Sequence, residues 1–111
     1  MSKVLSLLIL LATLLAGEAI AADLLVPESY KTIQGAIEAA APGDTVLVNE
    51  GVYTENLVIH KPLRLKSVKG PEFTVVRPAV KEEPVILASG TEGVVISGFT
   101  AKGSQSSGIT L

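Results

Sequence analysis

The chain has 111 residues, of which 48% are hydrophobic and 18% charged, a balance that fits one small folded domain and excludes a disordered, collagenous or coiled-coil chain. Nine basic residues stand against eleven acidic ones, giving a net charge of −2, so we expect no nucleic-acid partner, because no excess of positive charge is available to bind phosphates. Cysteine is absent, which excludes disulfides, thiol nucleophiles and cysteine-ligated metals.

The N-terminal segment, residues 1–21, has the three parts of a secretory signal peptide. Lys3 supplies a basic start, residues 4–16 form an apolar run, and Ala19 and Ala21 are small residues at −3 and −1 of a cleavage point before Ala22. A helix of about 13 residues spans roughly 20 Å, short of the roughly 30 Å hydrocarbon core, so we expect no stable membrane span. The sequence therefore predicts cleavage after Ala21 and a product that is secreted or lies in the periplasm or cell envelope.

A short helix is predicted over residues 33–40. It is indicated by apolar residues at i, i+3, i+4 and i+7, which are Ile33, Ala36, Ile37 and Ala40. Thr32 or Ser29 can cap its first turn, and Pro42-Gly43 ends it. A helix of two turns is unstable alone in water, so its apolar face must be covered by the rest of the fold.

Short apolar runs separated by Gly, Pro and Asn follow the helix. They predict seven strands, at 45–48, 57–59, 63–66, 74–76, 85–87, 94–97 and 109–111. Before the helix, residues 24–30 are predicted to be an extended entry segment, because Pro27 disfavours helix at Val26. No second helix pattern separates the strands, which excludes a doubly wound sheet.

The strand spacing predicts an all-β solenoid. The strand centres form two interleaved series with a period of about 20 residues; one series is Val46, Arg64, Ile86 and Thr110, and the other is Val58, Val75 and Val95. A β-sandwich, the alternative, spaces its strands by roughly 8 to 12 residues. We expect a parallel β-helix whose first coil is capped by a helix at about 32–41, with coils from residue 45 onward.

Alternation along the strands predicts which side chains face the interior. The inward set is Val46, Val48, Leu57, Ile59, Leu63, Leu65, Val85, Leu87, Val94 and Ile96. Arg64 and Lys66 then face solvent, and Leu47 and Ile86 form an outward apolar stripe suited to being covered by a loop or partner. Phe73 and Phe99 lie beside strands and are expected in the core.

Several motifs arrive in a fixed order along the chain: TIQ-AI-AA, PGDTVLV, GVYTENLVI, KPLRLKS, GPEFTVV, GVVISGFT and SGITL. This set, from Val26 to Leu111, resembles the N-terminal part of right-handed parallel β-helix proteins of the pectin lyase-like superfamily. PGDTVLV and GVVISGFT are most similar to the NosD-type periplasmic proteins and their uncharacterised relatives. YKTIQ-A and G-Y-E-N are more distantly similar to the start of pectin methylesterases.

The resemblance implies an exported right-handed β-helix module that binds carbohydrate or belongs to a polysaccharide lyase, hydrolase or esterase. The alternative is a non-enzymatic envelope scaffold, including a NosD-like accessory protein for a copper enzyme. In the esterase branch the catalytic Asp, Gln and Arg lie on later coils, whereas the only Asp residues here are Asp23 and Asp44. Whether a longer parent protein is an enzyme therefore stays open.

We expect this chain to be truncated after about four coils, with downstream coils missing, since it ends directly after the strand at 109–111. We expect no catalytic, cofactor-binding or metal-ligating residue in it, and no cofactor. A polysaccharide or a cell-envelope component is the expected partner.

Polar residues at turns are the candidates for a site. His60, the only histidine, would need partners such as Glu55 to hold a metal, and a solvent-exposed turn residue is the favoured interpretation. Glu50 and Glu55 offer a carboxylate pair of the kind that glycoside hydrolysis uses. A structural turn, with Gly51 at positive φ and Tyr53 packed on the coil, is favoured there as well.

Two further features have a structural interpretation. Asn49 and Asn56 are predicted to hydrogen-bond the backbone of adjacent coils. The GSQSSG segment at 103–108 is predicted to be an ordinary loop, because a phosphate-binding loop needs a helix after it and a strand follows here.

Overall fold

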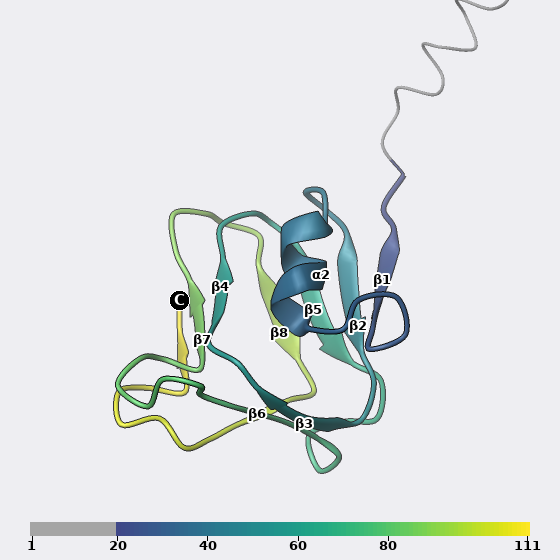
Figure 1. The fold of residues 1–111 in the computed structure, drawn as a ribbon. Helices are drawn as coiled ribbons and strands as arrows, with labels where there is room; N and C mark the ends of the chain where they lie inside the picture. Colours follow the sequence, from purple (N-terminus) through teal and green to yellow (C-terminus); the bar gives the residue numbers. More distant parts are fainter. Residues whose placement is uncertain (1–19) are drawn as a thin grey trace, which may run out of the picture.

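The computed structural model describes residues 20–111, which form a β-solenoid of three parallel sheets around one core (Figure 1). Almost all of the predicted signal peptide, residues 1–19, lies outside the described residues. Every pair of neighbouring strands is parallel, which confirms the solenoid and excludes the antiparallel sandwich. The elements are β1 (Asp23–Val26), α2 (Ile33–Ala39), β2 (Thr45–Val48), β3 (Gly51–Thr54), β4 (Leu57–Ile59), β5 (Arg64–Ser67), β6 (Thr74–Arg77), β7 (Ile86–Ala88), β8 (Val95–Ser97), β9 (Thr100–Ala101) and β10 (Ile109–Thr110).

The strands stack in three sheets, which we call A, B and C. Sheet A has the order β1-β2-β5-β8, sheet B the order β3-β6-β9, and sheet C the order β4-β7-β10. The two predicted series are therefore wrong in detail, since the first joins strands of sheets A and C and the second takes one strand from each sheet. The coils are also unequal in length. Thr45 pairs with Arg64 and Arg64 pairs with Val95, so the second of these two coils is much the longer.

Three strands were not predicted from the sequence. β1 occupies the stretch predicted as an entry segment and pairs along its whole length with β2, so sheet A begins at Asp23 and not at residue 45. β3 lies where a turn was predicted, and it pairs with β6. β9 is only two residues long.

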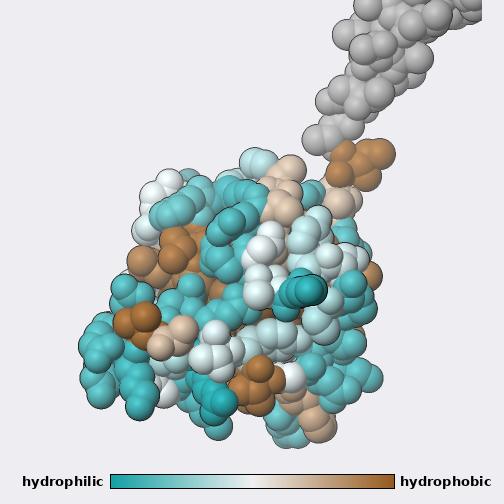
Figure 2. Space-filling model, in the orientation of Figure 1, coloured by the Kyte–Doolittle hydropathy of each residue, from teal (hydrophilic) through white to brown (hydrophobic). Residues whose placement is uncertain are grey.

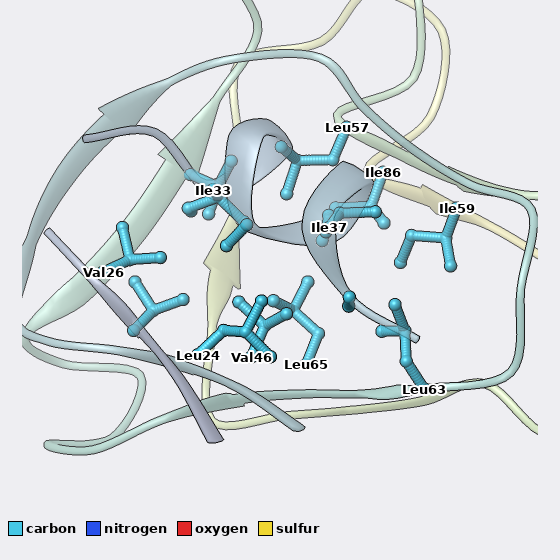
Figure 3. Close-up of a cluster of buried hydrophobic side chains, with 14 of the residues drawn as sticks. Leu24, Val26, Ile33, Ile37, Val46, Leu57, Ile59, Leu63, Leu65 and Ile86 are labelled. Carbon is cyan, nitrogen blue, oxygen red and sulfur yellow. The ribbon is translucent and has the colours of Figure 1, made fainter. Parts of the chain in front are cut away.

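The core runs through the middle of the solenoid and is lined by the inward side chains of its strands, part of which Figure 3 shows. Seven of the ten predicted interior residues are buried, namely Val46, Val48, Leu57, Ile59, Leu63, Leu65 and Val85. Val94 and Ile96 are half-buried and pack against the core. Arg64 and Lys66 are exposed, as predicted.

The predicted orientation of β7 is wrong. Ile86 and Ala88 are buried, whereas Leu87 is only half-buried, because the register of sheet C places Ile86 on Leu57 and Ala88 on Ile59. The predicted stripe of Leu47 and Ile86 therefore does not exist. Leu47 is flanked in sheet A by Leu25 and Lys66.

Of the two phenylalanines predicted in the core, only one packs there. Phe99 is half-buried against the core. Phe73 is 57% exposed, because it lies just before β6, outside the strand whose alternation directs side chains inward.

Helix α2 covers one end of the core, as predicted (Figures 1 and 3). It contacts β1, β2 and β4 and buries Ile33, Ala36 and Ile37. Thr32, not Ser29, is the N-cap, with its hydroxyl accepting a hydrogen bond from the Gly35 amide at 3.0 Å. Among the described residues, sheets B and C have no strand beside β1, because they begin with β3 and β4. The helix occupies this place and keeps the apolar end of the core from water.

Candidate functional site

A groove follows the outer face of sheet C beside α2. Its larger part, about 490 Å³, is lined by Gln34, Ile37, Glu38, Asn56, Val58, His60 and Lys61. A second hollow of about 240 Å³ shares Asn56 and Val58 and is lined also by Leu57, Glu83, Pro84 and Leu87. We call the two together the sheet C groove. Figure 2 shows apolar surface to the left of α2, bordered by hydrophilic residues.

The wall of the groove nearest the helix is fixed by a cap on the helix N-terminus. The Glu55 carboxylate accepts from the amide of Ile33 at 2.9 Å and from that of Gln34 at 3.0 Å. With the Thr32 hydroxyl on Gly35, the first three helix amides, which have no partner within a helix, are satisfied. Glu55 is therefore a structural residue, as favoured from the sequence, while Glu50 is exposed.

Gln34 binds the free edge of β4 as a neighbouring strand would. Its side-chain amide donates to the Val58 carbonyl at 3.1 Å and accepts from the Val58 N–H at 2.9 Å. An uncovered edge of this kind would offer unpaired backbone groups to other chains. Gln34 was not singled out from the sequence. The sequence signal that could have indicated it is TIQ, residues 32–34, at the start of the helix, together with Glu55 one coil later.

The other end of α2 is held by Lys61. Its ammonium group donates to the carbonyl of Ala40 at 2.7 Å and to that of Glu38 at 3.2 Å. These are two of the carbonyls that a helix leaves unpaired at its C-terminus, where a cation also interacts favourably with the helix dipole. Lys61 is a second lining residue that the sequence did not indicate.

Asp44 closes the turn between α2 and β2. Its carboxylate accepts from the amide of Ala22 at 2.9 Å and from that of Ala41 at 2.8 Å. These two hydrogen bonds, and more weakly the charge of Lys61, hold the pKa of Asp44 below its ordinary value although burial acts against them.

Asn56 fixes the far wall of the groove. Its side-chain oxygen accepts from the Val80 amide at 2.7 Å, and its NH₂ group donates to the carbonyls of Val80 and Pro84, both at 3.0 Å. The prediction of bonds to an adjacent coil is thus confirmed for Asn56. For Asn49 it is wrong, because that side chain accepts from the next residue, Glu50, at 3.0 Å.

The segment around Gly51 has the predicted structural role, although it forms strand β3 and not a turn. Gly51 has φ 152°, and a Cβ added there would lie 3.4 Å from the Tyr53 ring. The Tyr53 hydroxyl donates to the Asn49 carbonyl at 2.8 Å. Burial raises the pKa of Tyr53, and the charges of Glu28 and Glu55 raise it further.

His60 is an exposed turn residue, as favoured from the sequence, with Nδ1 3.2 Å from the Ser89 carbonyl oxygen. Within residues 20–111 no three side chains of His, Asp or Glu are grouped to hold a metal ion. In the larger part of the groove, His60 and Glu38 are exposed polar side chains beside an apolar surface. Gln34, Asn56 and Lys61 have polar atoms already bonded to the backbone.

The segment 103–108 is a loop, as predicted, and it packs on the neighbouring coil. The Ser104 hydroxyl donates to the Glu83 carbonyl at 2.8 Å, and the Gln105 amide to the Lys81 carbonyl at 2.7 Å. The strand β10 follows the loop, so no helix N-terminus is present there to bind phosphate.

The fold defines the class of protein to which the chain belongs, the parallel β-solenoids. No known protein family, curated protein or solved structure matches the chain. In the part of the chain that the structure describes, no helix is long and apolar enough to cross a membrane.

Proposed function

We propose that this chain is an exported carbohydrate-binding β-helix module of the pectin lyase-like type, with the sheet C groove as its binding surface. The observation that carries the proposal is the groove itself, which runs across successive coils from α2 and β4 toward β7. A saccharide chain presents apolar C–H faces edged by hydroxyl groups. Binding sites with an apolar lining and a few polar groups suit such a ligand.

The chemistry of the lining residues supports this assignment. Val58 and Leu87 are neighbours in the register of sheet C and provide an apolar surface across two coils. Glu38 and His60 provide an acceptor and a ring nitrogen for sugar hydroxyls at one end, and Glu83 provides a second acceptor at the other.

The groove is also preformed. Gln34, Lys61 and Asn56 are tied to the backbone of β4, of α2 and of the 80–84 segment, respectively. Little ordering is then required when a ligand binds, which lowers the entropic cost of association. This rigidity does not supply acid–base catalysis, so the proposed role is binding.

The test is calorimetric titration of the exported protein with oligomers of polygalacturonate, methylated pectin and alginate. The substitution His60→Ala should weaken binding of the preferred oligomer by about tenfold, the equivalent of one hydrogen bond. Arg64→Ala, on the outer face of sheet A, is the matched control and should leave binding unchanged. Loss of binding with Arg64→Ala alone would place the site on sheet A and contradict the proposal.

A second candidate function is a non-enzymatic envelope scaffold, including a NosD-like accessory role for a copper enzyme. It is favoured by the number of polar groups near the groove that are bonded to the backbone, since these hold coils together. If none of the three saccharides binds to the intact protein, the scaffold is the better conclusion. A copper titration followed by absorption spectroscopy would then test the accessory role.

A further inference from the structure

The first strand of the solenoid is anchored through the backbone of the residue before it. The Ala22 amide donates to the Asp44 carboxylate at 2.9 Å, and the Ala22 carbonyl accepts from the Thr45 amide at 2.9 Å. Asp44 is buried, with 7% of its surface exposed. The nitrogen of Ala22 is therefore held against a buried carboxylate.

Ala22 is also the residue that the signal-peptide pattern places directly after the cleavage point. Ile20, Ala21 and Ala22 are all exposed, and β1 begins only at Asp23. Hydrolysis of the Ala21–Ala22 bond thus removes no residue of the sheet. The nitrogen atom that the predicted cleavage would free is therefore the one that is bonded to Asp44.

We infer that removal of the leader at Ala21–Ala22 creates an N-terminal ammonium group that forms an ion pair with Asp44 and thereby locks β1 onto the solenoid. The inference rests on the export proposed above and is independent of the sheet C groove, so a failure to bind saccharides leaves it intact.

The chemistry of the step is an ordinary peptide hydrolysis by a signal peptidase with water. The C–N bond between Ala21 and Ala22 breaks, the hydroxyl of water goes to the Ala21 carbonyl carbon, and its proton goes to the Ala22 nitrogen. At neutral pH the amine takes a second proton from solvent, because the pKa of an α-amino group is about 8. An amide donor is thus replaced by a cation, and hydrogen bonds between charged groups are the stronger kind.

The nitrogen keeps its place after cleavage because β1 is paired with β2 along its whole length and the Ala22 carbonyl stays bonded to Thr45. Three charged groups besides Asp44 lie on the elements packed around the Ala22 nitrogen. Lys61 interacts favourably with Asp44 from the β4–β5 corner. Asp23 and Arg64 flank Thr45 in the outward row of sheet A. The pair with Asp44 should raise the pKa of the Ala22 amine.

The first test is the mass of the protein after export of the full chain from a secreting bacterium. The expected product begins at Ala22, and Ala21→Leu, which places a large side chain at −1, should block cleavage. A product that retains Met1, or one that begins elsewhere, would overturn the inference.

The second test measures the pKa of the new amino group in the processed protein. Reductive ¹³C-methylation keeps the charge of the amine and gives an NMR signal that can be titrated. We expect a pKa above the value of about 8 that a free α-amino group has. An unshifted value would show that no ion pair forms, even if Asp44 variants fail to fold.

The third test is thermal unfolding of the processed protein. At pH 7, Asp44→Asn should lower Tm by about 4 °C or more, while the matched control Asp23→Asn should change it little. A group with a raised pKa stabilises fully below its unfolded value of about 8 and loses that effect as pH rises through its folded value. The difference between wild type and Asp44→Asn should therefore shrink by pH 10. An unchanged difference would overturn the ion pair.

Discussion

Gln34 occupies the place that a strand of another coil would take beside β4. One side chain satisfies both the N–H and the carbonyl of Val58, while the Glu55 carboxylate satisfies the amides of Ile33 and Gln34. The helix and the first strand of sheet C are thus linked by hydrogen bonds between residues that lie a full coil apart in the sequence. At this edge the single side chain of Gln34 makes the two hydrogen bonds that a neighbouring strand would make with Val58.

Substitution of Gln34 should therefore lower the stability of the protein more than is usual for a half-buried side chain. Gln34→Ala leaves two partly buried backbone groups of Val58 without partners, and we expect a loss of about 1–3 kcal/mol in the free energy of unfolding. Urea denaturation measures this loss. Gln105→Ala, at the only other glutamine and in an exposed loop, is the control and should change stability by less than about 0.5 kcal/mol. Equal effects of the two substitutions would contradict the role of Gln34.

The lowered pKa of Asp44 predicts how the stability of the protein depends on pH. Its folded pKa lies below the ordinary value of 3.8, so its contribution to stability is present above that value and is lost as pH falls through the lowered folded pKa. In urea denaturation between pH 7 and pH 2, wild type should exceed Asp44→Asn in stability by a margin that shrinks only below about pH 4. Asp23→Asn serves as the control. A constant margin over this range would show that the carboxylate charge is not involved.

At the scale of elements, the register of a strand is decided by its neighbours and not by its own sequence alone. Val85, Ile86 and Leu87 are three apolar residues in a row, so no alternation distinguishes the inward positions. Pairing with Leu57 places Ile86 inside. In β5 the inward Leu65 was predicted correctly, because the charged Arg64 and Lys66 on either side of it mark the outward positions.

The structure of β7 makes a direct comparison possible. Ile86→Ala empties a buried position and should cost about 2–5 kcal/mol, whereas Leu87→Ala, one residue along, should cost about 1 kcal/mol or less because Leu87 is half-buried on the outer face. Chemical denaturation of both variants measures the difference. The reverse order would restore the orientation that alternation of the sequence suggested.

Most parts of the site that could be predicted have a local cause; Asn56 is the exception, since its partners lie one coil away and were expected from the usual role of amides in solenoid turns. Thr32 was identified as a possible cap, and His60 and Glu55 as turn residues, from their neighbours in the sequence. The partners of Glu55, which are the amides of Ile33 and Gln34 one coil earlier, were not identified. Gln34 and Lys61 were not identified, since their partners lie a full coil away in the sequence. The strand β3 was not predicted because Gly51 is typical of a turn, and its strand character comes from pairing with β6.

At the scale of the whole molecule, the two ends of the solenoid differ. The end near α2 has inward residues that are buried, such as Leu24 and Val26. In the last described coil, Ile96 and Ala101 are only half-buried and Ile109 is 44% exposed. Strands β8, β9 and β10 each have one neighbouring strand among residues 20–111.

Hydrogen exchange should reveal this difference as a gradient along the solenoid axis. In a stacked fold each coil is stabilised by its neighbours, and local opening is easiest where apolar contacts are few. Amides of β2, β4 and β5 should exchange more slowly than those of β8, β9 and β10, as measured by mass spectrometry of peptic fragments. Uniform protection would indicate that these residues unfold as one cooperative unit.

The unequal coils also make this scaffold permissive to engineering. A shorter coil, from Thr45 to Arg64, and a longer one, from Arg64 to Val95, share sheet A without any break in its pairing, so the additional residues are accommodated outside that sheet. The corner at 89–93 is largely exposed and contains two glycines with positive φ, Gly90 and Gly93. Since each doubling of loop length costs only about 0.6 kcal/mol in closure entropy, a peptide epitope grafted into this corner would be displayed without disturbing the strands on either side.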